Sequence, residues 1–155
     1  MGETQYLSLA DVIAIHERPM RRLGAAPNPL RDEGLLESAV MRSQMAAYYE
    51  GADIVRQAAL LGVGISQAQA FLDGNKRTAY LALNTFLRMN GFTYSGDRLA
   101  LAQRFEQFAE RSGDADAAID AFETWLRERV QPRDEGHSRK QSFRRPTRQE
   151  DIGNG

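Results

Sequence analysis

Apolar side chains along the first 130 residues recur at the spacing of amphipathic helices, and no segment shows the alternation typical of strands. Polar residues that commonly cap helices stand before most of these apolar runs. The predicted helices run from Leu9 to about Arg22 with an interruption or curve near Pro19, from Gly34 to about Gln44, from Asp53 towards Gln69, from Ala79 to Met89, from Asp97 to Arg111, and from Asp114 past Leu126. The sequence therefore predicts an all-α fold, in which Gly91 to Gly96 form a short extended or turn segment.

Two of these segments carry specific packing predictions. The helix from Ala79 to Met89 has almost no polar face. Because a helix that is apolar nearly all round is usually buried, we expect it at the centre of the bundle. In the second helix Leu35 is expected on the buried stripe, and Tyr48 and Tyr49 are expected to anchor the connection that follows.

A carboxylate, a glycine, an amide and two cations occupy five consecutive positions, Asp73 to Arg77, directly before the apolar helix. The first N–H groups of a helix have no internal partner and the helix dipole adds partial positive charge, so a loop at this place can bind an anion. Gly74 lets the backbone approach a ligand, and Arg77 can hold a phosphate with two parallel hydrogen bonds. Asp73 would repel a phosphate unless a divalent cation such as Mg²⁺ lay between them.

A simpler interpretation is that Asp73 to Asn75 form a turn and that Lys76 and Arg77 are solvated charges. Cations in the first turn oppose the helix dipole, however, and stability alone favours Asp or Glu there. The position of Lys76 and Arg77 therefore indicates that an anion is expected beside them.

The residues from Gln69 to Thr78 also resemble the signature of the Fic/Doc superfamily, His-x-Phe-x-Asp-Gly-Asn-Lys-Arg-Thr. Every position from Ala70 to Thr78 fits this pattern, and the resemblance covers roughly residues 5 to 130, the length of the short Doc branch. Further segments similar to Doc-type toxins are Leu9 to His16, Leu35 to Ala39 and Ala46 to Tyr49. The resemblance implies a compact helical bundle around the buried helix that follows the loop.

The first signature position is a histidine in the family and Gln69 in this chain. In the family that histidine accepts the proton of a hydroxyl that attacks a nucleotide phosphate, which a Gln amide does not do at neutral pH. Loss of such a group costs about two to four orders of magnitude in rate. A natural degenerate copy and a substitution that lets a toxic protein be produced both fit Gln69. His16 is a candidate substitute base, but we favour a structural histidine that bonds a nearby backbone group.

The resemblance implies a Doc-like toxin of a type II toxin–antitoxin system, which transfers a phosphate-containing group from ATP or another nucleoside triphosphate to a protein hydroxyl. The short chain favours phosphorylation of elongation factor Tu over AMP transfer. By resemblance, Gly74, Asn75, Lys76 and Arg77 would bind the phosphates, Asp73 would hold Mg²⁺, and a Phd-like antitoxin would inhibit in trans. Open alternatives are a Fic-type AMP transferase, a non-catalytic nucleotide- or protein-binding module, and a structural helical domain whose motif is accidental.

Composition adds a few constraints. The 155 residues suffice for one domain, which we place at residues 1–130. The absence of cysteine excludes disulfides and thiol chemistry, and the net charge of −1 gives no electrostatic case for nucleic-acid or membrane binding. With no apolar stretch of membrane-spanning length and no secretion signal at the N-terminus, a cytoplasmic protein is expected. Residues 131–155 are polar and basic, and we expect them to form a disordered, solvated tail.

Overall fold

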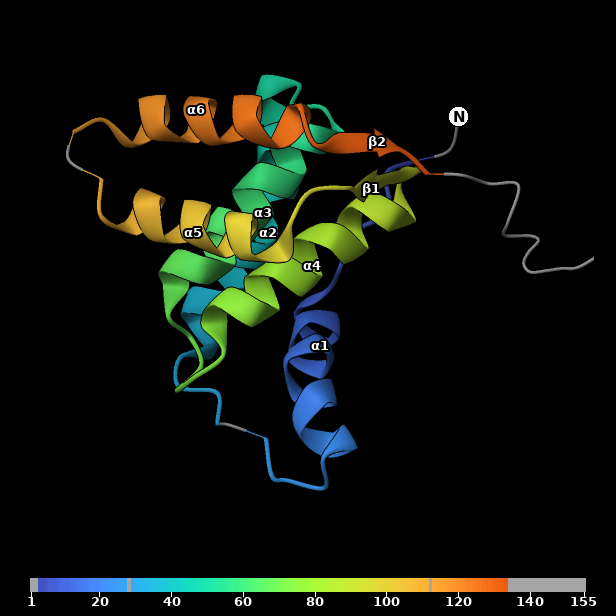
Figure 1. Ribbon diagram of the computed structural model, residues 1–155, viewed down its shortest axis with the longest axis vertical. Coiled ribbons are helices and arrows are strands. Elements are labelled where there is room, and N and C mark those ends of the chain that lie inside the picture. Colours follow the sequence, from blue (N-terminus) through green and yellow to red (C-terminus); the bar gives the residue numbers. More distant parts are fainter. Residues whose placement is uncertain (1–2, 28, 112, 134–155) are drawn as a thin grey trace, which may run out of the picture.

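A computed structural model describes residues 3–27, 29–111 and 113–133 of the chain. This part folds into six helices and a small two-stranded sheet, arranged as in Figure 1. The elements are α1 (Leu9–Arg22), α2 (Glu33–Glu50), α3 (Ile54–Ala68), α4 (Asn75–Met89), β1 (Phe92–Tyr94), α5 (Arg98–Ala109), α6 (Ala115–Arg127) and β2 (Val130–Pro132). The prediction of an all-α fold is confirmed, and a membrane-crossing helix is not found in the described residues.

Helices α3 and α4 form the centre of the fold, and α3 packs most extensively against α2 and α4. The helix predicted to be central, α4, buries one face, while Met89 at its end is 38% exposed. The more deeply buried of the two is α3. Its Gly62 permits the close approach, because a Cβ there would lie 2.7 Å from Leu83 Cδ1 of α4 and 3.1 Å from Phe105 Cζ of α5.

Helix α2 is longer than the sequence predicted and continues to Glu50. Ala46 is still buried in this extension, and Gly51, with a φ of 68°, ends the helix in the left-handed conformation. Tyr48 and Tyr49 therefore lie in the last turn of α2, where they are 80% and 70% exposed. The prediction that they anchor the next connection is wrong, because the connection begins only after the glycine.

Two smaller predictions concern α1 and α2. Helix α1 runs through Pro19 as one continuous helix, so of the predicted interruption or curve the interruption does not occur. Leu35 was expected on the buried stripe of α2 together with Leu36, Ala39 and Val40; those three are buried, but Leu35 is 49% exposed.

The sheet was not predicted. Strands β1 and β2 pair antiparallel, with Phe92 opposite Pro132, and three-residue strands are too short to show an alternation of side chains. Strand β2 extends the folded part past the boundary placed at residue 130, and the N–H of Arg133 donates to Gly91 O at 2.8 Å. The tail predicted beyond this point lies outside the described residues.

Candidate functional site

The motif loop, defined as residues 69–74, joins α3 to α4. Its first half pairs with the segment before α2: Leu30 and Phe71 form an antiparallel bridge, and the N–H of Arg31 donates to Ala70 O at 2.6 Å. The Arg31 guanidinium also donates to Gln69 O at 2.7 Å. These contacts hold the start of the motif loop against the N-terminal end of α2.

The side chain of Asn75 holds the motif loop from the inside. Its Nδ2 donates to Phe71 O at 2.9 Å, and its Oδ1 accepts from Phe71 N at 3.1 Å. In the same turn Thr78 Oγ1 donates to Gly74 O at 2.8 Å. Asn75, which was predicted to bind phosphate, thus also organises the loop through its buried side chain.

Within the described chain, α4 is the one helix that begins without a side-chain cap. Its N-cap is Gly74, with a φ of 83°, and its first turn holds no acidic residue. The first N–H groups of α4 therefore have no partner within the helix and lie next to the cationic Lys76 and Arg77. The side chains that cap the other five helices belong to Ser8, Asp32, Asp53, Asp97 and Asp114.

Two nitrogens of the Arg77 guanidinium, Nε and Nη2, are buried and have no hydrogen-bond partner among the described residues. The guanidinium is permanently charged, and a buried donor without an acceptor costs about 1–3 kcal/mol. Nη2 lies beside Gly74, where a Cβ atom would come within 2.6 Å of it. A phosphate would satisfy these donors, because arginine and phosphate can form two parallel hydrogen bonds.

Lys76 and Asp73 occupy more exposed positions. Lys76 Nζ lies 2.9 Å from Glu106 Oε2 on α5, so a phosphate would have to compete with this carboxylate. Asp73 Oδ1 accepts from Gly74 N at 2.8 Å. No cluster of three potential metal ligands occurs in the part of the chain that the structure describes. Mg²⁺ fits the site only with phosphate oxygens beside the Asp73 carboxylate, which is a common arrangement for this ion.

Gln69 forms the C-cap of α3 and is the one non-glycine residue with a positive φ, 52°, in the described ranges. Its Nε2 donates to Ser66 O at 3.0 Å, so the amide turns back onto the last turn of α3. A carboxamide neither accepts a proton at neutral pH nor becomes cationic. The side chain at this position therefore completes a helix end and offers no acid–base chemistry.

His16 of α1 reaches the motif loop. Its ring is 1% exposed and stacks on Phe71, with ring centroids 3.6 Å apart and an interplanar angle of 8°. Its Nε2 lies 2.9 Å from Asp73 O. The prediction of a structural histidine that bonds a backbone group is confirmed, and the bonded group belongs to the motif loop itself. No local signal in the sequence could have identified this contact between distant segments.

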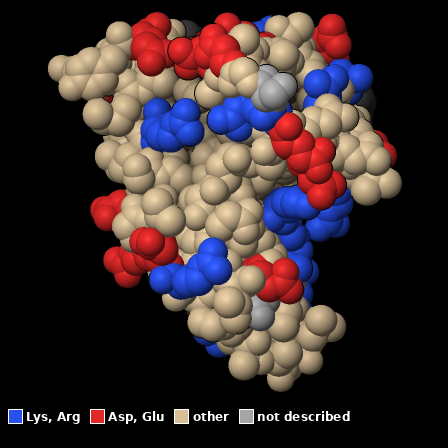
Figure 2. All heavy atoms as spheres, turned by 90° about the vertical axis from the view of Figure 1, so that its left-hand side faces the viewer, with Lys and Arg blue, Asp and Glu red and all other residues tan. Residues whose placement is uncertain are grey.

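Asp53 and Arg56, two residues with shifted pKa values, lie at the N-terminal end of α3, away from the motif loop. A hydrogen bond from Arg127 lowers the pKa of the Asp53 carboxyl, and hydrogen bonds to Glu123 and Asp120 raise the pKa of Arg56. These ion pairs join α3 to α6. On the face shown in Figure 2, basic and acidic side chains are interspersed. Electrostatic attraction of an anionic ligand would therefore come from the local charges of the motif loop and α4.

In this helical fold, α4 begins after a glycine and without a side-chain cap. The Arg77 guanidinium beside it is buried and has no acceptor for two of its nitrogens in the described chain. These features define a candidate anion-binding protein. The comparison with known sequences is more specific. The sequence profile of the Fic/DOC family matches residues 6–87, just over half of the chain, and the chain belongs to this family.

Two relatives extend this result. "Toxin Doc" of Mycolicibacterium smegmatis is 42% identical over 72 residues, which cover 44% of this chain and 54% of that protein. "Protein kinase doc" of Escherichia phage P1 is 34% identical over 88 residues, which cover 56% of this chain and 69% of that protein. The matched part thus spans about half the length of the first relative. The resemblance inferred from the motif is confirmed at the level of the family.

Proposed function

We propose that the protein is a Doc-like toxin whose motif loop and α4 bind the phosphates of a nucleoside triphosphate. The observation that carries this proposal is the pair of buried Arg77 nitrogens at the uncapped start of α4, for which the described chain provides no acceptor. A phosphate would satisfy these donors and would be stabilised by the helix N-terminus. Membership of the Fic/DOC family and the names of the two relatives, a toxin and a protein kinase, support the same proposal.

Each residue of the site has a separate part in this proposal. Asn75 and Lys76, as the first residues of α4, would donate backbone N–H groups to the phosphates, and the Arg77 side chain would hold them from the side. The N–H of Gly74 is bonded to the Asp73 carboxylate, so it becomes free for phosphate only when that carboxylate turns away. Magnesium bound between Asp73 and the phosphates would offset their negative charge.

The proposed reaction transfers the terminal phosphoryl group of ATP to a hydroxyl of elongation factor Tu. The bond from phosphorus to the bridging oxygen of the departing ADP breaks, a bond to the hydroxyl oxygen forms, and the hydroxyl proton must leave. Gln69 accepts no proton, and His16 is buried with Nε2 bonded to Asp73 O. We therefore propose that this chain transfers the phosphoryl group about two to four orders of magnitude more slowly than the same chain with histidine at position 69. Fic-type AMP transfer is the alternative reaction for the same site.

The test compares the protein as it stands with Gln69→His and with Arg77→Gln. Phosphotransfer to elongation factor Tu is followed with ATP labelled at the terminal phosphate, and ATP affinity is measured by calorimetry. Gln69→His should gain transfer without a change in affinity, whereas Arg77→Gln should bind ATP about 10- to 100-fold more weakly because charged hydrogen bonds are lost. Unchanged affinity in Arg77→Gln would contradict the proposed phosphate site. Transfer of a label placed at the innermost phosphate would indicate AMP transfer instead.

A non-catalytic binding module is the second candidate. The observation that favours it is the hydrogen bond from Gln69 Nε2 to Ser66 O, which gives the glutamine a structural use. In this case the protein binds ATP or an antitoxin, and Gln69→His restores neither phosphotransfer nor growth inhibition in cells. Histidine adopts positive φ more readily than most residues, so Gln69→His should fold, as circular dichroism can verify.

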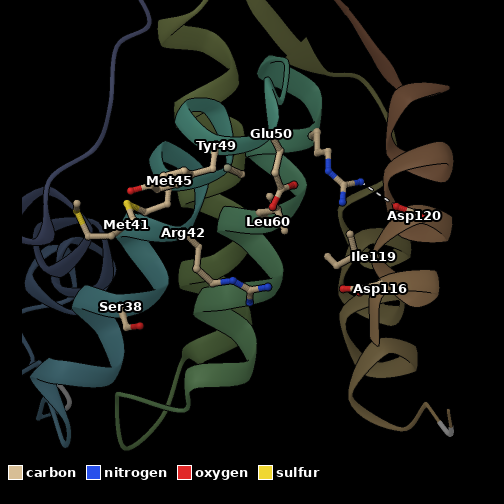
Figure 3. A pocket seen from close by; sticks show the side chains of 12 residues that line it. Ser38, Met41, Arg42, Met45, Tyr49, Glu50, Leu60, Asp116, Ile119 and Asp120 are labelled. Carbon is tan, nitrogen blue, oxygen red and sulfur yellow. Dashed lines mark hydrogen bonds and ion pairs between the residues drawn. The ribbon is translucent and has the colours of Figure 1, made fainter. Parts of the chain in front are cut away.

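A groove of about 800 Å³ lies between α2 and α6, beside the first half of α3 (Figure 3). From α2 it is lined by Met41, Met45 and Tyr49, which are 43%, 47% and 70% exposed, and from α6 by Asp116 and Asp120. Exposed methionine and tyrosine are enriched at protein interfaces, and grooves of this kind accept amphipathic helices. We propose that a segment of a Phd-like antitoxin folds into this groove and inhibits the protein in trans.

Met45→Asp tests the antitoxin groove. A charge on the apolar wall should weaken binding of the antitoxin about tenfold or more in calorimetry. Leu99→Asp is the control, because Leu99 is also exposed but lies on α5 and does not line the groove. Equal affinity of the two variants would place the antitoxin elsewhere, and failure to bind any antitoxin would contradict the toxin–antitoxin proposal.

A further inference from the structure

We propose that His16 is a positioning residue, which fixes the peptide between Asp73 and Gly74 and thereby the direction in which the motif loop presents its N–H groups. The proposal depends on the proposed function only for its consequence, the binding of phosphate. The contact itself is a property of the fold without ligand. His16 has no part in the proposed transfer chemistry and lies outside the motif.

His16 holds the motif loop at two points. It comes from the middle of α1 and is separated from Asp73 by 57 positions in the sequence. The face of its ring stacks on Phe71 at a centroid distance of 3.6 Å, and the edge of its ring bonds Asp73 O through Nε2 at 2.9 Å. Because the ring is 1% exposed, its position is determined by the core of the protein. The exposed end of the loop is therefore tied to a rigid element.

The peptide that His16 holds is the one that begins α4. In a planar trans peptide the carbonyl of Asp73 and the N–H of Gly74 point in opposite directions. Since His16 holds the carbonyl oxygen from inside the fold, the N–H is directed outward, where it donates to Asp73 Oδ1 at 2.8 Å. Gly74 also lies between the ring and the guanidinium: a Cβ there would be 3.4 Å from His16 Nε2 and 2.6 Å from Arg77 Nη2. The same peptide thus sets the surroundings of Arg77.

The other anchors of the motif loop hold different peptides. The Asn75 side chain bonds the N–H and the carbonyl of Phe71, and Leu72 N donates to Pro29 O at 3.1 Å. For the carbonyl of Asp73, the described chain provides a hydrogen bond from His16 alone. Without it the loop would keep its first half and lose the orientation of its last peptide.

Packing alone does not explain an imidazole at this position. A carbonyl oxygen only accepts hydrogen bonds, so Nε2 of His16 must carry a proton in this contact. Nδ1 is buried and has no partner within the described residues. A phenylalanine would stack on Phe71 equally well and would bury no unpaired nitrogen. The hydrogen bond to Asp73 O is what distinguishes histidine from an apolar ring here.

The experiment compares His16→Phe with Tyr6→Phe in the full chain. His16→Phe keeps an aromatic ring against Phe71 but removes the donor to the motif loop. Tyr6→Phe is the matched control, because it removes a hydroxyl that donates to Gln57 Oε1 at 2.8 Å, a contact that the motif loop does not share. NMR relaxation gives the backbone order parameters of the loop without ligand, and calorimetry gives the dissociation constant for ATP with Mg²⁺.

We expect His16→Phe to lower the order parameters of Asp73 and Gly74 from about 0.85 to below about 0.6, and to weaken ATP binding about tenfold. Tyr6→Phe should change neither quantity. Unchanged order parameters in folded His16→Phe would overturn the proposal. If His16→Phe does not fold, His16→Gln is the second test of the proposal. Its amide retains an N–H donor, so an ordered loop is expected, and a mobile loop would overturn the proposal. If the parent protein binds no ATP, the proposed function is refuted. If the loop nevertheless loses order only in His16→Phe, the role of His16 is supported.

Discussion

Replacing Gly74 by alanine should disturb the candidate phosphate site more than it disturbs the fold. Gly74 has a φ of 83°, in the left-handed region that other residues occupy at a cost of about 1–2 kcal/mol. The new Cβ would lie 2.6 Å from Arg77 Nη2, so the guanidinium must move. The tip of a long side chain moves at little cost in stability, but the movement takes the Arg77 donors away from the start of α4.

Gly91→Ala is the matched control for this prediction. Gly91 follows the other end of α4 with a φ of 90°, and a Cβ there would meet no atom within 4 Å. Both substitutions should lower the free energy of unfolding by about 1–2 kcal/mol, a decrease in melting temperature of about 2–8 °C for a domain of this size. Only Gly74→Ala should weaken ATP binding, by about 10- to 100-fold if charged hydrogen bonds worth about 1.5–3 kcal/mol are lost.

Urea unfolding measures the change in stability, and calorimetry with ATP and Mg²⁺ measures the change in affinity. The expected pattern is a similar loss of stability in both variants and a loss of affinity in Gly74→Ala alone. Unchanged affinity in Gly74→Ala would mean that the Arg77 guanidinium does not contact the phosphates. An equal loss of affinity in both variants would mean that strain in α4, rather than the position of Arg77, governs binding.

Two further predictions concern the core and the response to acid. Gly62→Ala should lower the free energy of unfolding in urea by about 1–3 kcal/mol, because its Cβ would lie 2.7 Å from Leu83 Cδ1. Helix propensity predicts a gain in stability for Gly34→Ala, which is exposed and serves as the control. A similar gain in Gly62→Ala would show that α3 and α4 can move apart. The pKa of Asp53 lies below its ordinary value of 3.8, chiefly because Arg127 hydrogen-bonds the ionised carboxylate. This contact therefore stabilises the fold above about pH 4 and is lost as the pH falls through the lower pKa of the folded state. Asp53→Asn keeps a helix cap and should lose less stability than the parent between about pH 7 and about pH 3 in urea titrations; an equal loss would contradict the assignment.

The features that the sequence predicted are local ones. The caps of α1, α2, α3, α5 and α6 bond N–H groups two or three positions further on, so a polar residue before an apolar run identifies each helix start. The charge pattern at the start of α4 is equally local, because Lys76 and Arg77 are the second and third residues after the N-cap Gly74. Short-range stereochemistry was enough to indicate both the helices and an anion site.

The features that the sequence did not predict join distant segments. The bond from His16 to Asp73 spans 57 positions and the pair of Lys76 with Glu106 spans 30. Strand β1 likewise finds its partner β2 only after two intervening helices. Such contacts depend on how the helices pack, and helical periodicity gives the buried face of each helix without giving its neighbours. The end of α2 differs from the prediction for a local reason: the helix continues through Tyr48 and Tyr49 and ends only at Gly51.

The described contacts separate the shape of the motif loop from the chemistry of its first residue. Arg31 holds position 69 through the backbone oxygen, at 2.7 Å, and the Asn75 side chain and the His16 ring anchor later parts of the loop. The Gln69 amide bonds only Ser66 O, at the end of α3. None of the bonds that shape the rest of the loop passes through that amide. Under the proposed function, a glutamine in place of the family's histidine therefore removes a proton acceptor without removing any of these anchors. The backbone at position 69 has a positive φ, and histidine adopts such a φ more readily than glutamine does. The backbone conformation at this position therefore suits the family's histidine, although this chain carries glutamine.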